Sequence, residues 1–344
     1  MSTSYLVFVP GIMGSKLYLP GPARHCVWEE YAPTVMFTLL RPWLLEGYRR
    51  LEVGPVFSGS YTYGPLLMAL EQNGFKSNAN FLAFGYDWRQ STRVSGAQLI
   101  TKLAEILPTL GNAKFTLLGH SMGCLVIRAA ILEEPSLQGT IAKIIDLAPP
   151  HRGASMAFRQ LNQVPDLHLH PIVTRAIDLI RRSWPSMGNH VDSMFSQLIK
   201  SFPGVWDLLP PDDEEILRDS VGRTRSALHW EGWSDAVEVS GAITRQRYAL
   251  YNRMFQLGAV SIPTALVVGS GSLTEYLFDY SPNPPYGVDF QNLTRVDGDG
   301  TVIVDSAEWL KSLNPSMPYL QMTGDHTLIT QHPRVHQWVL NEIP

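Results

Sequence analysis

The sequence predicts an α/β fold in which a mostly parallel sheet is covered by helices on both faces. Short, nearly continuous apolar runs recur along the chain, as strands buried on both faces require, and segments with helical signals separate them. The strands expected on this basis are Tyr5–Val9, Phe81–Phe84, Phe115–Leu118, Ile144–Leu147, Ala265–Val268 and Tyr319–Met322.

The segments between these runs carry the signals of helices. Pro65–Gln72 has proline in its first turn and Gly74 beyond its end, which are typical start and stop residues. Gln98–Leu107 places its apolar residues on one face. Met122–Glu133 follows the third apolar run at once, and Arg334–Leu340 is expected to be the terminal helix.

Two segments break this alternation and predict the domain organisation. Residues 26–60 are apolar with few charges, and residues 155–260 show a predominantly helical pattern that includes an apolar stripe from Ile172 to Ile180. We therefore expect a core formed by residues 1–154 and 261–344. An apolar cap insertion is expected at about 26–60, and a mainly helical cap or lid at 155–260.

The composition is that of an ordinary globular protein. Of the 344 residues, 45% are hydrophobic and 17% are charged, and the formal net charge is -4. This balance supplies no basic surface, so a nucleic-acid partner is not expected. His168 and His170 have no cysteine near them in the sequence, and neither a metal nor another cofactor is expected.

The cysteines and the first apolar run bear on the compartment. Cys124 lies inside a motif that needs a small buried residue, so Cys26 and Cys124 are expected to be unpaired thiols in a reducing compartment. Tyr5–Val9 is too short for the apolar part of a signal peptide and follows no basic residue. No stretch approaches the roughly eighteen apolar residues of a membrane span. These features predict a soluble, cytoplasmic protein.

The run Gly119–Gly123 (GHSMG) predicts a nucleophilic serine. Two glycines and a serine at this spacing occur by chance in about one chain in ten, so the bare pattern is weak. Its context is more specific, because a strand is expected before it and a helix after it. The glycines then allow a tight turn that pushes the Ser121 hydroxyl out at the carboxyl edge of the sheet. This arrangement favours an α/β-hydrolase fold over a glycine turn without chemistry.

A nucleophilic serine needs a base, and the base needs a carboxylate to hold it. In this fold the carboxylate precedes the histidine along the chain. A turn with Asp297 and Asp299 lies downstream of the fifth expected strand, and a loop with His326 follows the last strand. Asp146, in the fourth expected strand, is the next candidate for the acid.

Other roles for nearby residues are weaker. His120 is a competing base, but it lies within the turn itself and is expected to pack beside it. His332 and His336 fall at the terminal helix, where surface positions are expected. The two aspartates also begin a calcium-loop spacing, but the position that requires glycine in such a loop is Val302.

Acyl transfer also requires donors for the oxyanion. One donor is expected to be the amide of Met122, which follows the serine at the start of a helix. The second is expected from the glycine-rich run Pro10–Ser15 after the first strand, where the Ile12 amide is best placed. The alternative for this run is a plain glycine turn.

Several motifs together resemble one family. They are Val9–Ser15, Gly85–Arg89, Gly119–Gly123, Ala148–Pro150, Leu208–Pro210 and Gly298–Val302. This set is similar to the lecithin:cholesterol acyltransferase family, which includes lysosomal phospholipase A2 and phospholipid:diacylglycerol acyltransferases, and it spans nearly the whole chain. The resemblance implies Ser121 as nucleophile, Asp299 rather than Asp297 as acid, and His326 as base.

The resemblance also bears on substrate contacts. It implies oxyanion amides at Ile12 and Met122. The apolar segment with Phe37 and Trp43 falls where family members carry a membrane-touching subdomain, so both residues are candidates for substrate binding. Trp88, in the motif Gly85–Arg89, is a candidate for the acyl entrance.

The motif Gly85–Arg89 has an equally good structural explanation. In that alternative, Asp87 pairs with Arg89 and Trp88 packs in the interior. Two departures from the family pattern are visible. The cysteines of the secreted members are missing, and Ile303 stands where many members have proline.

These features predict a serine hydrolase that cleaves a hydrophobic carboxylic ester through an acyl-enzyme, as lipases, phospholipases and esterases do. The alternative is an acyltransferase that passes the acyl group to an alcohol. A non-catalytic ligand-binding protein is a third class, but such proteins typically lose a triad residue. The expected partner is a hydrophobic ester or lipid, with possible peripheral contact to a membrane surface.

Overall fold

The computed structural model describes residues 4–39, 41–162, 182, 198–230, 262–281 and 287–344. At its centre lies a six-stranded sheet with the order β13-β10-β7-β6-β1-β5, in which every neighbouring pair is parallel. The strands are β1 (Ser4–Val9), β5 (Phe81–Ala83), β6 (Lys114–His120), β7 (Ile141–Leu147), β10 (Thr264–Ser270) and β13 (Tyr319–Thr323). All six strands predicted from the apolar runs are confirmed.

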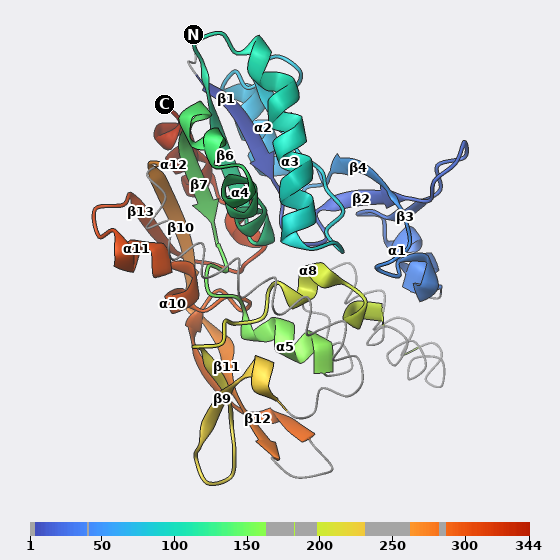
Figure 1. The fold of residues 1–344 in the computed structure, drawn as a ribbon, viewed down its shortest axis with the longest axis vertical. Helices are drawn as coiled ribbons and strands as arrows, with labels where there is room; N and C mark the ends of the chain where they lie inside the picture. The colour runs from blue at the N-terminus through green and yellow to red at the C-terminus, as the bar shows by residue number, and fades with distance from the viewer. Residues whose placement is uncertain (1–3, 40, 163–181, 183–197, 231–261, 282–286) are drawn as a thin grey trace.

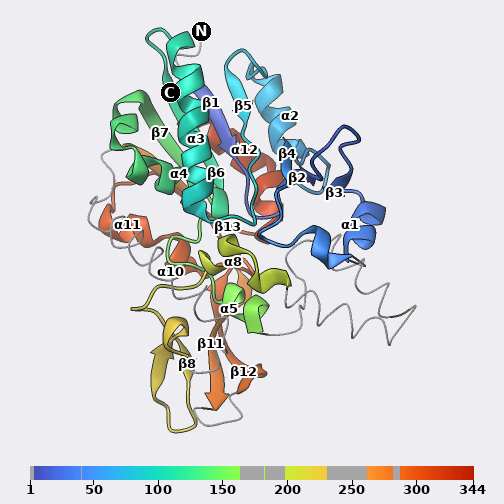
Figure 2. The same cartoon turned by 45° about the vertical axis from the view of Figure 1, so that its right-hand side comes forward.

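Helices cover both faces of this sheet, as predicted. Helices α3 (Thr92–Ile106) and α4 (Met122–Glu133) lie on one face, and α2 (Gly64–Gln72) and α12 (Pro333–Glu342) lie on the other (Figures 1 and 2). Helix α4 is buried along most of its length because α3 packs over it. Helix α3 begins earlier than the sequence pattern indicated, because the Ser91 side chain caps its first turn by accepting the Val94 N–H.

The apolar insertion at about 26–60 contributes to a small sheet of its own. Strand β2 (Ser15–Tyr18) pairs antiparallel with β3 (Cys26–Trp28) on one side and β4 (Glu52–Val56) on the other. Helix α1 (Ala32–Leu39) packs on β3, and a short 3-10 helix, η1 (Pro42–Leu44), follows.

A second additional sheet, with the order β12-β11-β8-β9, extends away from the carboxyl edge of the central sheet (Figures 1 and 2). Its strands are β8 (Glu215–Arg218), β9 (Thr224–Ser226), β11 (Ser272–Ser281) and β12 (Gly287–Gly298). This sheet was not expected from the sequence. Strands β8 and β12 contain charged and exposed or half-buried residues, and so they lack the continuous apolar run of a central strand.

The predicted cap at 155–260 is described only in part. The described portion contains helix α5 (Ser155–Asn162), the short helix α8 (Pro203–Trp206), strands β8 and β9, and the 3-10 helix η4 (Ala227–His229). The apolar stripe from Ile172 to Ile180 lies outside the described residues. The described portion is therefore mixed in secondary structure, because β8 pairs with β11 and β9 pairs with β8.

Short helices complete the described chain. They are η2 (Leu107–Thr109), η3 (Pro135–Thr140), α10 (Val304–Ala307), α11 (Trp309–Leu313) and η5 (Leu328–Gln331). Cys26 and Cys124 are free thiols. Among the described residues, no helix has the length and apolar character needed to cross a membrane.

Candidate active site

Ser121 occupies a strained turn between β6 and α4. Its backbone has φ 51° and ψ -126°, a conformation that residues other than glycine adopt rarely and at a cost of about 1–3 kcal/mol. The Ser121 N–H donates to the carbonyl oxygen of Leu147 at 2.9 Å, which ties the turn to the end of β7. A Cβ atom at Gly123 would lie 2.2 Å from the Val9 carbonyl oxygen, so the approach of this turn to β1 requires glycine.

His326 lies on the loop after β13 and meets Ser121 directly. Its Nε2 is 2.8 Å from the Ser121 Oγ, and its Nδ1 is 2.7 Å from Oδ2 of Asp299. The His326 backbone N–H also donates to the Asp299 carbonyl oxygen at 2.9 Å. The side chains of all three residues are buried. The structure therefore brings the three predicted residues into one hydrogen-bonded chain.

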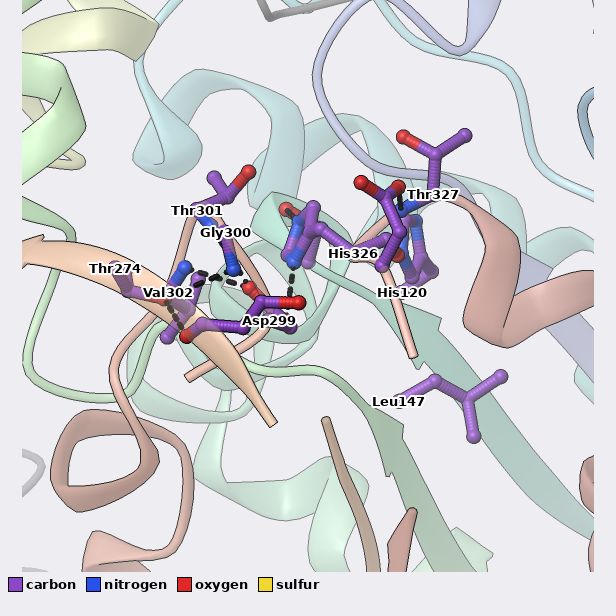
Figure 3. Close-up of polar contacts among 12 residues, drawn as sticks. His120, Leu147, Thr274, Asp299, Gly300, Thr301, Val302, His326 and Thr327 are labelled. Carbon is purple, nitrogen blue, oxygen red and sulfur yellow. Dashed lines mark hydrogen bonds and ion pairs between the residues drawn. The ribbon is translucent and has the colours of Figure 1, made fainter. Parts of the chain in front are cut away.

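The Asp299 carboxylate is fixed by its own turn (Figure 3). Oδ1 accepts the backbone N–H groups of Thr301 at 3.0 Å and Val302 at 2.7 Å, which leaves Oδ2 for His326. Asp297 is directed elsewhere, because its Oδ1 accepts the Gly271 N–H at 2.6 Å. Of the two aspartates on this segment, Asp299 is the one that contacts the histidine.

The surroundings of His326 favour its protonated form. Burial by itself would lower its pKa, but the negative charge of Asp299 and the hydrogen bond to Nδ1 outweigh burial, and the pKa is raised above its ordinary value of 6.5. An imidazole in this position can take a proton from Ser121 and hold it while charge develops on a substrate.

The oxyanion loop, residues 10–15, passes close to Ser121. A Cβ atom at Gly11 would lie 3.0 Å from the Ser121 Cβ. The Gly11 N–H already donates to the Tyr63 hydroxyl at 2.8 Å. Within the described part of the chain, neither the Ile12 N–H nor the Met122 N–H donates to a backbone carbonyl of another segment. These two amides are therefore available to a ligand at Ser121.

Three buried aromatic side chains donate hydrogen bonds to carbonyl groups of the oxyanion loop. Tyr86 donates its hydroxyl proton to the Pro10 carbonyl at 2.9 Å. The indole N–H groups of Trp28 and Trp88 donate to the carbonyls of Met13 at 3.0 Å and Ser15 at 3.3 Å. The loop shape is thus fixed before any substrate arrives, which is what electrostatic stabilisation of an oxyanion requires.

Trp88 does not line the pocket beside Ser121. It is fully buried, and its ring centroid lies 5.2 Å from that of Trp28. Its neighbour Arg89 donates to Asp87 from Nη2 at 2.6 Å and from Nε at 2.8 Å. The alternative structural explanation of this motif therefore holds. It corrects the assignment of Trp88 as a substrate-binding residue, because packing buries the indole beneath the loop.

Phe37 and Trp43 also lie off the pocket wall. Their exposed fractions are 47% and 45%, whereas Val35 and Leu45 on the same segment are each 1% exposed. The segment is therefore divided between core residues and exposed aromatic residues. Phe37 and Trp43 are therefore not direct contacts in the pocket beside Ser121, because both side chains face solvent.

The pocket beside Ser121, which we call the acyl pocket, is mainly apolar. Ile12, Ser121 and His326 are among the residues that line it. The remaining wall draws on helices α5 and α8 and on loops around them, with Phe57, Met156, Ala157, Val205, Leu208 and Val302 among the lining residues. Such a wall suits a hydrocarbon chain attached to the carbonyl that Ser121 reaches.

Tyr63 had no signal in the sequence, whereas His120 is buried beside the turn as expected. Tyr63 and His120 both line the acyl pocket and are hydrogen-bonded to each other at 2.9 Å. Asp146, the alternative acid, does not contact His326. It is instead ion-paired with Arg128 at 2.8 Å and bonded to His151 at 3.1 Å.

This combination of sheet, turn and loop order defines an α/β-hydrolase. Residues 50–277 match the family described as Lecithin:cholesterol acyltransferase. The match covers more than half of the chain, so the protein belongs to the lecithin:cholesterol acyltransferase family.

Similar proteins agree with this membership. From Arabidopsis thaliana, Lecithin-cholesterol acyltransferase-like 4 is 29% identical over 97 residues, which are 27% of this chain and 18% of that protein. Phospholipase A(1) LCAT3 from the same plant is 31% identical over 99 residues, or 27% of this chain and 22% of that protein. The chain thus spans about a fifth of the length of the curated relatives that it matches.

A solved structure shares the fold over almost the full length. One chain in the crystal structure of the Tle4-Tli4 complex superposes with a TM-score of 0.65 at 13% identity. The superposition covers 97% of this chain and 96% of that one.

Proposed function

We propose that this protein is a serine hydrolase that cleaves a hydrophobic carboxylic ester of the lipase, phospholipase or esterase type. The observation that carries the proposal is the hydrogen-bonded chain Ser121–His326–Asp299 on the wall of an apolar pocket. Membership in a family named for acyl transfer supports the same class of chemistry. In this account Ser121 is the nucleophile, His326 the base, and Asp299 the carboxylate that orients the base.

The first half of the reaction forms an acyl-enzyme. Ser121 Oγ attacks the ester carbonyl carbon while its proton passes to Nε2 of His326. The negative charge on the former carbonyl oxygen is stabilised by the N–H groups of Ile12 and Met122. The bond to the alcohol oxygen then breaks, and His326 returns the proton to that leaving oxygen.

The second half depends on the acceptor. If water enters, His326 takes its proton, the hydroxide attacks the acyl carbon, and Ser121 leaves with the proton restored. If an alcohol enters instead, the same steps produce a new ester, and the protein is an acyltransferase. The family description favours this second activity, while a similar plant relative carries the name of a phospholipase A1.

The apolar insertion supports contact with a lipid surface. Phe37 and Trp43 are about half exposed, and Tyr31 and Tyr48 are exposed on the same segment. We propose that these aromatic residues rest on the surface of a membrane or micelle from which the substrate is drawn. Helices α5 and α8 supply part of the acyl pocket, which supports a capping role for the segment at 155–260.

A product assay tests the proposal. The protein is incubated with short p-nitrophenyl esters and with phospholipid vesicles, with and without added long-chain alcohol, and the products are identified by mass spectrometry. Release of free fatty acid in all cases indicates a hydrolase. An ester of the added alcohol indicates an acyltransferase. A folded wild-type protein that yields neither product from any substrate would contradict the proposal, and Ser121→Ala serves as the background control.

A further inference from the structure

We propose that Tyr63 and His120 are a positioning pair that locks the oxyanion loop to the loop of the catalytic base. The proposal rests on the function proposed above, since it assigns the pair to the same reaction. It concerns residues that touch neither the substrate carbonyl nor the transferred proton.

The hydrogen bonds of the pair can have only one direction. The carbonyl oxygen of His326 can only accept, so Nε2 of His120, 3.1 Å away, carries the ring proton and donates it. In neutral His120, Nδ1 is then an acceptor, and the Tyr63 hydroxyl donates its proton to it at 2.9 Å. The same hydroxyl oxygen accepts the Gly11 N–H at 2.8 Å. The tautomer of His120 is thus fixed by its neighbours.

This series of hydrogen bonds ends at the oxyanion loop on one side and at the His326 loop on the other, and both loops act on the substrate in the proposed reaction. Gly11 directly precedes Ile12, which offers an oxyanion amide. The carbonyl at the other end belongs to His326 itself. His120 is also joined by its peptide bond to Ser121. The two side chains of the pair therefore link the nucleophile, the base and the oxyanion loop, which are far apart in the sequence.

The surroundings make the pair rigid and keep it out of proton transfer. Tyr63 and His120 are 7% and 4% exposed, and the Tyr63 ring packs on Phe8 with centroids 4.9 Å apart. Burial, together with the neighbouring His326, lowers the pKa of His120 to about 3, and burial raises the pKa of Tyr63. Both groups therefore stay neutral in the working range, and neither nitrogen of His120 is free to accept the proton of Ser121.

Neutrality has a second consequence. The His120 and His326 rings are 5.1 Å apart between centroids. When His326 becomes positively charged by taking the serine proton, a neutral His120 adds no repulsion. The pair can hold the base in place without opposing the charge that forms on it.

Three variants cut the chain at different points. Tyr63→Phe removes the acceptor of the Gly11 N–H. His120→Asn keeps a carbonyl oxygen at the position of Nδ1 but no longer reaches His326. His120→Gln keeps an N–H group at the position of Nε2 and so retains the His326 end. The matched control is Tyr61→Phe, because Tyr61 is 73% exposed and its hydroxyl belongs to no part of the site.

The test measures kcat and KM on a short soluble ester, the rate of labelling by a fluorophosphonate, and the melting temperature. Misplacement of reacting groups by a fraction of an ångström to one ångström lowers rates by up to about 100-fold. We expect Tyr63→Phe and His120→Asn each to lower kcat and the labelling rate by roughly 10- to 100-fold while KM changes less than about twofold. His120→Gln should recover part of the loss seen in His120→Asn, and Tyr61→Phe should match the wild type.

A double-variant cycle adds a readout that simple packing would not change. Because the two residues act through one chain, Tyr63→Phe combined with His120→Asn should lower kcat by less than the product of the two single effects. Single variants that keep wild-type kcat, or that lower only the melting temperature, would overturn the proposal. An inactive wild-type protein would instead count against the proposed function, so the two failures are distinguishable.

Discussion

The carboxylate of Asp299 lies 2.7 Å from Nδ1 of His326, and its other oxygen accepts two N–H groups from its own turn. This relationship fixes the orientation of the Asp299 carboxylate towards His326. It also separates Asp299 from Asp297, whose carboxylate closes the turn at Gly271. The geometry therefore favours Asp299 over Asp297 as the carboxylate that orients His326.

A comparison of two isosteric variants tests this assignment. Asp299→Asn removes the charge that stabilises protonated His326, and we expect activity to fall by about 10⁴-fold. Asp297→Asn weakens one backbone contact, costs about 1 kcal/mol of stability, and should leave activity within about tenfold of the wild type. Steady-state rates and denaturation curves on both variants check this. If Asp297→Asn proved the more damaging to activity, the acid would be misassigned.

The pH profile reports the same interaction. In the proposed mechanism His326 must be neutral to act as the base, and Asp299 raises the pKa of this histidine above 6.5 despite burial. We therefore expect kcat/KM to decline as pH falls through a value above 6.5. In Asp299→Asn the two largest effects that raise this pKa are lost, while burial and the smaller effect of Asp325 remain, so the residual activity should show its acidic limb at a lower pH. A limb that stays in place after this substitution would mean that another group controls the profile.

Buried Asp146 should matter for stability rather than for chemistry. It is fully buried against Arg128, so Asp146→Asn leaves a buried charge without its partner and should cost about 3–5 kcal/mol of unfolding free energy. The folded fraction should keep its rate per labelled active site. Asp213→Asn is the control, because Asp213 is 63% exposed in its pair with Arg152 and should change stability by less than about 1 kcal/mol. A selective loss of turnover in folded Asp146→Asn would reopen its candidacy as the acid.

Much of the fold and the site was predictable from the sequence, for a physical reason. Strands buried on both faces must be apolar throughout, so each central strand is visible as a run. The serine turn needs small residues where backbones touch, and Gly123 meets that need at the Val9 carbonyl. Both requirements act on residues that are consecutive in the sequence, so both are visible as short sequence patterns.

Other features depend on contacts between distant segments. Strand β12 is largely exposed and is held by pairing with β11, so it leaves no apolar run. Tyr63 and His120 are separated by 57 positions in the sequence. Their hydrogen bond forms only because α2 begins near the same loop at which β6 ends. Trp88 could line a pocket or fill a core, and only tertiary packing decides between these roles.

The exposed aromatic residues of the insertion predict a difference between substrates. Replacing Phe37 and Trp43 by serine should preserve the fold and the turnover of short soluble esters. Activity on vesicles should fall by roughly 10- to 100-fold, because each large side chain contributes about 1.5–3 kcal/mol when fully buried in an apolar phase. Val35→Ser is the matched control, since Val35 is 1% exposed and should lower the melting temperature. Equal losses on both kinds of substrate would remove the lipid-surface role.

The central claim is that Ser121 becomes acylated, and the most direct measurement is to locate the adduct. Wild-type protein and Ser121→Ala are treated with a fluorophosphonate, digested and mapped by mass spectrometry, and turnover is measured in parallel. We expect a single adduct on Ser121, no adduct in the folded variant, and a loss of turnover on the order of 10⁴-fold or more. An adduct on a different serine, together with retained turnover in Ser121→Ala, would contradict the account.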